Sequence, residues 1–173
     1  NRHGQRIWGE PRGKYAGYPV PQISIHRGVL QMALFQAARA RLGEGKVLTG
    51  HRFVGVDDQS PVTATFERPD GSRVAVEADI FVGADGIHST ARRLRYPDEG
   101  LPRYGGRILW RAVTRTTPFL TGATMIMAGY QDRKFVCYPI DKPGADGLQT
   151  INWIAELTID QMPERENWNK EGD

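Results

Sequence analysis

Ala-Asp-Ile-Phe-Val-Gly-Ala-Asp-Gly-Ile-His-Ser-Thr-Ala-Arg-Arg, residues 78–93, is the stretch that decides the fold. Its apolar run at residues 80–82 is typical of a short buried strand, and the Gly-Asp-Gly turn that follows ends such a strand. Ser89 stands where a helix N-cap is expected, so the pattern predicts a helix that begins at Thr90. A strand, a tight turn and a capped helix bring free backbone N–H groups and the Asp85 carboxylate to one place. Such a place suits a phosphate or a ribose hydroxyl.

The same stretch has a purely structural interpretation. Asp-Gly is a common turn pair and Ser is a common cap, so a strand-turn-helix junction needs no ligand. Spacing alone leaves both interpretations open, and the rest of the chain is needed to separate them.

Composition indicates a soluble globular protein. The chain has 173 residues, of which 39% are hydrophobic and 25% charged, which is enough for one domain with a sizeable core. No apolar run approaches the roughly 20 residues that cross a bilayer, so no membrane partner is expected. A lone cysteine, Cys137, excludes an internal disulfide and favours a reducing, cytoplasmic location.

The positive charge lies mainly in the first third of the chain. Residues 1–60 hold 9 Lys+Arg against 4 Asp+Glu, while residues 61–173 hold 14 against 16. These basic residues are scattered and form no run or stripe, so nucleic acid is not expected as a partner. A phosphate-bearing cofactor or an acidic substrate accounts for the charge better.

A helix is predicted to follow residues 24–28 and to run to about Leu42, because apolar residues recur there at helical spacing. The segment before it, residues 1–22, is expected to be loop, with a possible short strand at residues 5–8. Arg27 stands at the helix start, where a cation opposes the helix dipole. A bound anion beside the helix start would explain a cation at this position. The alternative is that Arg27 donates a hydrogen bond to a loop carbonyl.

Strands are predicted on both sides of the quoted stretch. Before it, three or more strands with alternating apolar positions form a β-meander. After it, consecutive strands follow one another without a helix, which means an antiparallel sheet. The predicted strands cover residues 47–49, 53–56, 62–66, 74–76, 107–114, 124–128, 134–139 and 149–157.

Large side chains on the later strands are candidates for core or for a ligand pocket. Alternation puts Trp110 and Arg111 on opposite faces. If the Trp110 face looks inward, Trp110, Met127 and Tyr138 are expected to form a flat apolar lining. If the other face does, Arg111 would meet a carboxylate.

Two segments carry a resemblance to a known family. The pattern Asp-x-x-x-Gly-Ala-Asp-Gly-x-x-Ser-x-x-Arg at residues 79–92 and Ile-His-Arg-Gly-x-Leu-Gln at residues 25–31 resemble motifs of the flavoprotein aromatic hydroxylases, the para-hydroxybenzoate hydroxylase family. The chain looks closest to the phenazine-modifying members, and it is less similar to salicylate and hydroxybenzoate hydroxylases.

The resemblance implies an α+β or α/β fold, the middle part of the para-hydroxybenzoate hydroxylase fold. Residues 1–98 would be the central part of the FAD-binding domain, and residues 99–173 part of the antiparallel substrate domain. The implied activity is that of a monooxygenase: NADH or NADPH reduces FAD, and O2 then supplies an oxygen atom to an aromatic acid. The implied cofactor residues are Arg27, Val54, Asp85, Gly86 and Arg92, and the implied substrate residues are Trp110, Arg111, Met127 and Tyr138.

The resemblance also implies that the chain is a fragment. The Gly-x-Gly-x-x-Gly motif should precede residue 1 and a Gly-Asp-Ala motif should follow residue 173, so the chain alone is expected to be inactive. No metal site and no catalytic side chain are predicted, since in such enzymes the cofactor carries out the chemistry. A non-catalytic binding or assembly module and a related FAD-dependent reductase or dehydrogenase remain as alternatives.

Overall fold

The computed structural model describes residues 3–160 and divides into two compact units. One unit comprises Asn1–Leu34 and Tyr104–Asp173, and the other comprises Phe35–Arg103. The predicted domain boundary between residues 98 and 99 stays a prediction. A further prediction from the sequence, a helix that starts at Trp168, lies outside the described residues.

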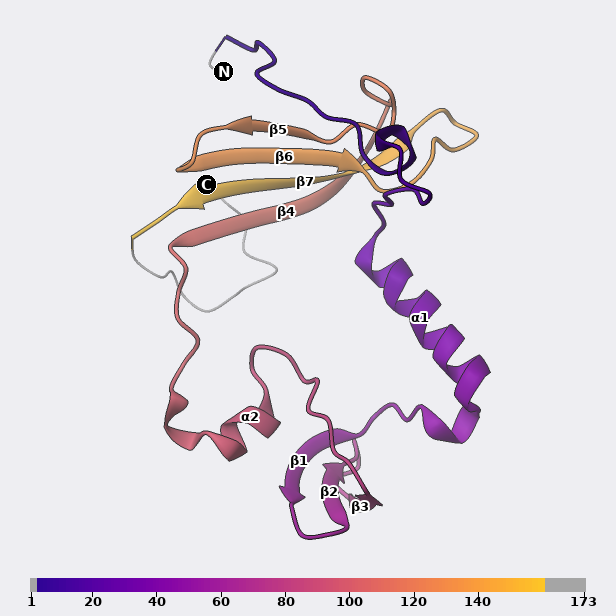
Figure 1. Ribbon diagram of the computed structural model, residues 1–173, viewed down its shortest axis with the longest axis vertical. Coiled ribbons are helices and arrows are strands. Elements are labelled where there is room, and N and C mark those ends of the chain that lie inside the picture. The colour runs from indigo at the N-terminus through magenta and orange to yellow at the C-terminus, as the bar shows by residue number, and fades with distance from the viewer. Residues whose placement is uncertain (1–2, 161–173) are drawn as a thin grey trace. The chain divides into compact units, whose positions relative to one another are not determined.

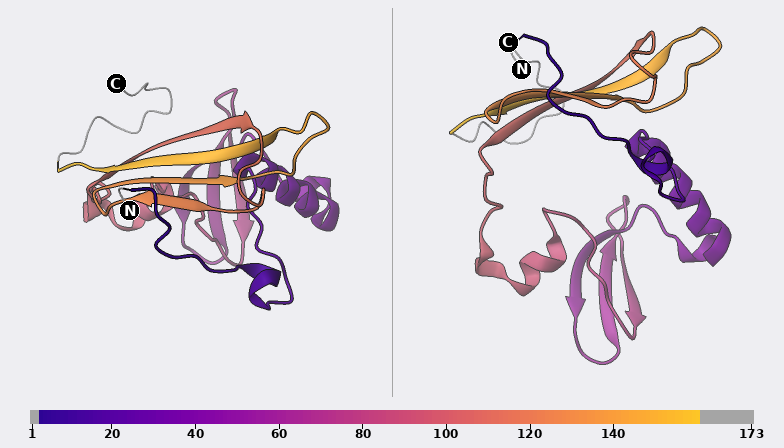
Figure 2. Two further views of the ribbon diagram at one scale, coloured as in Figure 1. Left: turned by 90° about the horizontal axis from the view of Figure 1, so that it is seen from above. Right: turned by 45° about the horizontal axis from the view of Figure 1, so that its top comes forward.

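The unit Phe35–Arg103 contains the predicted β-meander. Its strands are β1 (Arg52–Asp57), β2 (Val62–Glu67) and β3 (Arg73–Ala78), antiparallel in the order β1-β2-β3, and they lie side by side in the right-hand view of Figure 2. Alternating apolar residues on short strands joined by tight turns produce this arrangement.

A small aromatic cluster holds the meander together. Phe53 packs edge-on against Phe66 at 5.8 Å between ring centroids and stacks on Phe81 at 4.9 Å. Ala64 on the central strand is buried. Since Phe81 lies beyond β3, the stack ties the segment that follows the meander back to β1.

Strand β1 carries a bulge at Val54. Phe53 pairs with Phe66 and Gly55 pairs with Thr65, so Val54 is the extra residue between them. A bulge leaves one residue out of the ladder and bends the strand locally. The Val54 backbone therefore lacks a partner residue in the β1–β2 pairing.

The strand predicted at residues 80–82 is not formed. The structure assigns no strand to this segment, and Ile80 and Val82 are each 77% exposed. A strand requires hydrogen bonds to a neighbouring strand. None of the strands within residues 3–160 pairs with residues 80–82. The helix predicted after it is confirmed as α2 (Thr90–Arg95), and η3 (Pro97–Glu99) follows.

The long helix predicted near the front is confirmed as α1 (Arg27–Leu42). His26 precedes it: its carbonyl accepts from the Leu30 N–H at 3.1 Å, and its ring Nδ1 accepts from the Gly28 N–H at 3.1 Å. The first of these is the opening backbone bond of the helix, and the second satisfies an N–H group that the first turn of a helix leaves without a partner. Short 3-10 turns flank the helix at η1 (Gly13–Ala16) and η2 (Glu44–Lys46).

Two further strand predictions, at residues 5–8 and 47–49, are wrong, since neither segment forms a strand. Both are short and lie next to glycines, which favour turns and cost strands stability. The apolar residues in them reflect local composition rather than a sheet.

The predicted antiparallel sheet is confirmed in the other unit. Its strands are β4 (Arg107–Thr116), β5 (Ile126–Gly129), β6 (Arg133–Pro139) and β7 (Gln149–Thr158), and every paired neighbour is antiparallel. The order is β4-β7-β6-β5, so the first strand pairs with the last, as Figure 1 shows.

The register gives this sheet two different faces, because directly paired residues share a face. The aromatic face carries Ile108, Trp110, Ala112, Ile126, Phe135, Cys137, Ile151, Trp153 and Ala155. The mixed face carries Arg107, Leu109, Arg111, Val113, Met127, Lys134, Val136, Tyr138, Asn152, Ile154 and Glu156.

The aromatic face is consolidated by direct contacts. Phe135 and Trp153 stack at 6.2 Å between centroids, and the Trp153 Nε1–H donates to Thr114 Oγ1 at 3.2 Å. Ile151 on the same face is 5% exposed. Phe135 is still 43% exposed and Trp153 is half-buried, but the aromatic and aliphatic area that this face does bury stabilises the sheet and supplies core for the unit.

Candidate functional site

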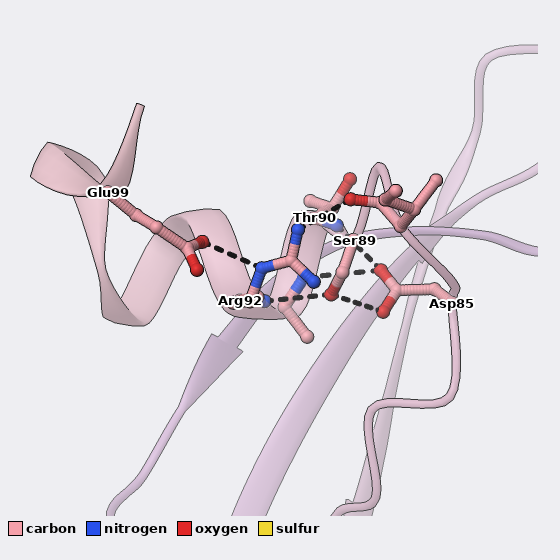
Figure 3. Close-up of polar contacts among 7 residues, drawn as sticks. Asp85, Ser89, Thr90, Arg92 and Glu99 are labelled. Carbon is pink, nitrogen blue, oxygen red and sulfur yellow. Dashed lines mark hydrogen bonds and ion pairs between the residues drawn. The ribbon is translucent and has the colours of Figure 1, made fainter. Parts of the chain in front are cut away.

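The Asp85 carboxylate is the centre of the first candidate site, and Figure 3 shows its contacts. One oxygen accepts from the Ser89 hydroxyl at 2.5 Å. The other accepts from the backbone N–H groups of Thr90 at 2.6 Å and of Ala91 at 3.2 Å. Asp85 therefore caps the start of α2 from outside the helix, together with the N-cap residue Ser89.

Ser89 and Arg92 extend this network to the end of η3. Ser89 Oγ accepts from the Arg92 N–H at 2.9 Å. The Arg92 guanidinium donates to the Ile87 carbonyl at 2.5 Å and to the Glu99 carboxylate at 2.7 Å. Arg92 thus holds the turn, the helix and the following 3-10 turn together.

The expectation of free backbone N–H groups at this turn is wrong. The N–H groups of Thr90, Ala91 and Arg92 are all donated to Asp85 or Ser89. The carboxylate occupies the place that an external phosphate would take. An anion at this turn is therefore supplied by the chain itself.

The Asp85 carboxylate keeps capacity for one more hydrogen bond. The Ser89 hydroxyl, and then the Ala91 and Thr90 N–H groups, hold the pKa of Asp85 below its ordinary value against the opposing effect of desolvation. The ionised carboxylate accepts about four hydrogen bonds, and three are formed here. The remaining acceptor position suits a hydroxyl group of a ligand.

Glycines set the shape of this turn. Gly86 has a φ of +80°, which favours glycine. A Cβ on Gly83 would lie 2.8 Å from the Cβ of Ala91, so only glycine lets the chain pass this close to α2. The turn and the helix are thereby fixed against each other.

The other predicted cofactor residues have distinct settings. Val54 is the bulged residue of β1, in the same unit as Asp85, Gly86 and Arg92. Arg27 is the first residue of α1 and belongs to the other unit. Its side chain is exposed and has no hydrogen bond or ion pair to any residue in the range 3–160.

The second candidate site is the mixed face of the four-stranded sheet. Arg111 pairs with Ile154, which pairs with Val136, which pairs with Met127. Tyr138 lies on the same face in the next row. The register therefore brings Arg111, Met127 and Tyr138 to one surface.

The predicted lining of Trp110, Met127 and Tyr138 is wrong as a group. Trp110 pairs with Ala155, and Ala155 pairs with Phe135, which puts Trp110 on the aromatic face. Alternation had separated Trp110 from Arg111 correctly, but the register between strands decides the remaining partners. The mixed face thus combines a cation with apolar side chains.

Arg111 is distinguished from the other cations of the mixed face by its lack of a partner. Arg107 and Lys134 both pair with Glu156, and Arg115 pairs with Asp146 at 2.7 Å. Within the described part of the chain, Arg111 has no such ion pair. Its charge is available to a ligand.

Asn152 was not predicted as a site residue. It lies on the mixed face in the row Val113, Asn152, Tyr138, and its side-chain Nδ2 is buried without a hydrogen-bond partner among the described residues. The one signal in the sequence was a polar residue alternating with apolar ones on a strand, which ordinarily means a solvent-facing position.

Among residues 3–160, no group of three or more His, Cys, Asp or Glu side chains is arranged to hold a metal ion. In the same range, no helix has the length and apolar character that crossing a membrane requires.

The chain has relatives among known proteins. No protein-family model matches the chain. The chain is 42% identical over 161 residues to phenazine 1,6-dicarboxylic acid hydroxylase PhzS of Lysobacter antibioticus, a match that covers 88% of this chain and 39% of that protein. The chain is similar to part of an aromatic hydroxylase. The resemblance predicted from residues 25–31 and 79–92 is thereby confirmed.

A solved structure shows the same fold in part. It is 2,6-dihydroxypyridine-3-hydroxylase from Arthrobacter nicotinovorans, with a TM-score of 0.50 and 21% identity over 72% of this chain and 33% of that one. The chain spans about two fifths of the curated relative and a third of this structure. Both relatives are, by name, hydroxylases of aromatic compounds.

Proposed function

We propose that this chain is part of an FAD-dependent monooxygenase that consumes NADH or NADPH and O2 and hydroxylates an aromatic acid. The observation that carries the proposal is the mixed face, where the unpaired cation Arg111 shares a surface with Met127 and Tyr138. A planar aromatic carboxylate needs an apolar surface and a countercharge. The name of the 42% identical relative supports a phenazine dicarboxylic acid as a candidate.

FAD would be held by the five residues that the sequence predicts, each through a different group. Arg27 offers an unpaired cation for a phosphate. Val54 offers backbone groups at a bulge, and Gly86 allows close approach of a ligand to the turn. Asp85 offers its remaining acceptor position to a hydroxyl group, while Arg92 keeps the turn in place. The chemistry that FAD supplies is electron transfer from NADH or NADPH and activation of O2.

The substrate would lie on the mixed face. Arg111 would bind the carboxylate, and Met127 and Tyr138 would contact the ring system. Trp110 lies on the other side of the sheet, where its half-buried indole packs on the strand that carries Arg111. Residues 1–98 and 99–173 would then correspond to the FAD-binding and substrate domains of the para-hydroxybenzoate hydroxylase fold.

The test uses the full-length protein that contains this chain. NADH and NADPH oxidation and O2 uptake are followed with phenazine-1,6-dicarboxylate, phenazine-1-carboxylate and salicylate. One of these acids should stimulate both, with a hydroxylated product. Reduced-cofactor oxidation without a hydroxylated product would instead indicate the reductase alternative, and stimulation by no acid would contradict the proposal.

Arg111→Ala is expected to raise the KM for the acid roughly 10- to 150-fold, because a charge-assisted hydrogen bond contributes about 1.5–3 kcal/mol. Arg115→Ala is the matched control, since Arg115 lies on the same strand and face but pairs with Asp146. Equal effects of the two substitutions would mean that net charge, rather than a contact with Arg111, accounts for the change.

A further inference from the structure

Two side-chain contacts join strand β1 to the segment that carries Asp85. Phe81, four residues before Asp85, stacks on Phe53 of β1 at 4.9 Å between ring centroids. Arg95, the last residue of α2, forms an ion pair with Asp58 at 2.5 Å, and Asp58 directly follows β1. The segment is therefore attached near both ends of the strand.

No strand pairing sets the position of this segment. Residues 80–82 pair with none of the strands within residues 3–160, so no backbone ladder fixes Asp85 relative to β1. Helix α2 lies beside β1 (Figure 2), and the ion pair between Asp58 and Arg95 joins the two elements. Side-chain contacts therefore decide where α2 lies along the strand.

Helix α2 transmits the Arg95 contact to Asp85. The Asp85 carboxylate accepts hydrogen bonds from the N–H groups of Thr90 and Ala91 in the first turn of the helix. The carboxylate and the helix therefore move together. A contact that anchors the end of α2 at Arg95 limits the movement of Asp85 as well.

Two of the residues proposed to hold FAD lie on the two elements that this ion pair joins. Val54 is the bulged residue of β1, four residues before Asp58, and Asp85 caps α2. One ligand that contacts both residues requires a fixed separation between them, because a hydrogen bond weakens steeply as its geometry departs from the preferred distance and angle.

We propose that Asp58 and Arg95 are positioning residues for FAD: their ion pair holds α2, and with it the Asp85 carboxylate, at a fixed separation from the Val54 bulge. This inference rests on the proposed function. It adds two residues that do not contact the cofactor and that act through Asp85.

The test measures FAD binding to the full-length apoprotein by fluorescence titration. Asp58→Arg replaces the ion pair by two like charges, which should weaken FAD binding roughly 2- to 30-fold. Asp98→Arg is the matched control, because it makes the same change of charge in the neighbouring turn η3 at a residue without an ion pair among residues 3–160. The double variant Asp58→Arg with Arg95→Glu restores opposite charges and should recover most of the lost affinity.

Hydrogen exchange of the apoprotein provides a second measurement that does not involve the cofactor. The N–H groups of Thr90 and Ala91 are protected by their bonds to Asp85. Loosening α2 at its far end should accelerate their exchange in Asp58→Arg, and the double variant should restore the protection. Asp98→Arg should leave the exchange of both amides unchanged.

The outcomes separate the two proposals. Wild-type protein that does not bind FAD overturns the proposed function and the positioning role together. Equal FAD affinities of Asp58→Arg and Asp98→Arg overturn the positioning role alone, and so does a loss that the double variant fails to recover. A loss of affinity with unchanged exchange at Thr90 and Ala91 also overturns it, because Asp58 would then act on FAD without moving α2.

Discussion

At the scale of single residues, Asp85 shows how one side chain can serve structure and ligand at once. Three of its hydrogen bonds go to Ser89, Thr90 and Ala91. These bonds keep the carboxylate ionised and fix its orientation, and they leave one of its acceptor positions for a ligand. A residue used in this way is sensitive to substitution for two reasons, and experiments have to separate them.

The pH dependence of stability separates the structural part. Since the pKa of Asp85 is lowered in the folded state, its stabilising effect is complete above its ordinary pKa of 3.8 and is lost as the pH falls through the lowered value. Asp85→Asn should therefore lower the Tm by a constant amount from pH 7 to pH 5, and the difference from wild type should shrink below about pH 4. A difference in Tm that persists at pH 2 would exclude the carboxylate charge as its cause.

Arg27 is a residue whose predicted role is binding alone, because its side chain is exposed and forms no hydrogen bond or ion pair with residues 3–160. In the full-length protein, Arg27→Ala should weaken FAD binding roughly 10- to 150-fold with little change in Tm. Arg41→Ala, near the other end of α1, is the control and should leave the dissociation constant of FAD unchanged. The measurement is a fluorescence titration of the apoprotein with FAD, and equal affinities of both variants would remove Arg27 from the site.

At the scale of elements, the two faces of the four-stranded sheet have different roles, packing on the aromatic face and proposed ligand binding on the mixed face. The aromatic face is held by the Phe135–Trp153 stack and the bond from Trp153 to Thr114. Among residues 3–160, the mixed face instead leaves the Arg111 side chain without an ion pair and Asn152 Nδ2 without a hydrogen bond. Stability and binding should therefore respond to different sets of substitutions on the same strands.

Trp153→Ala tests this division. Loss of a partly buried indole should destabilise the unit by about 2 kcal/mol, below the 3–5 kcal/mol typical of a fully buried one. Val113→Ala, on the mixed face and 49% exposed, should cost well under half as much. Urea denaturation of the full-length protein measures both, and equal losses would contradict the assignment of core to the aromatic face.

The elements also show what the sequence could predict. Helix α2, its cap Ser89 and the strands of both sheets follow from local patterns, and all were predicted. The grouping on the sheet faces was not, because alternation relates residues within a strand but not between strands. Pairing of β4 with β7 is a contact between distant segments, so the register that joins Arg111 to Met127 is invisible locally. The prediction of a strand at residues 80–82 failed for a similar reason, since a strand forms only when a neighbouring strand pairs with it.

At the scale of the whole molecule, burial is low. Among the described hydrophobic residues, only Ala64 and Ile151 are buried, while Leu34, Ile80 and Met127 are each more than 60% exposed. A domain with its own core buries far more. Much of the apolar surface therefore needs a covering partner for stability.

The isolated chain should consequently behave as a marginally stable protein. It is expected to bind the apolar dye ANS strongly and to unfold over a broad temperature range, whereas the full-length protein should bind little dye and unfold sharply. Calorimetry and dye fluorescence measure both. A sharp cooperative transition of the isolated chain would show that its two units are self-sufficient.

Cys137 gives the sheet a built-in chemical reporter. It is the one cysteine of the chain, it lies on the aromatic face, and desolvation raises the pKa of its thiol. Alkylation should therefore be slow while β6 stays packed and should accelerate when that strand opens. Because the thiol points away from the mixed face, an aromatic acid bound there would slow alkylation only by holding the sheet closed. The alkylation rate of Cys137 on the aromatic face would therefore measure how far a ligand on the mixed face suppresses opening of the sheet.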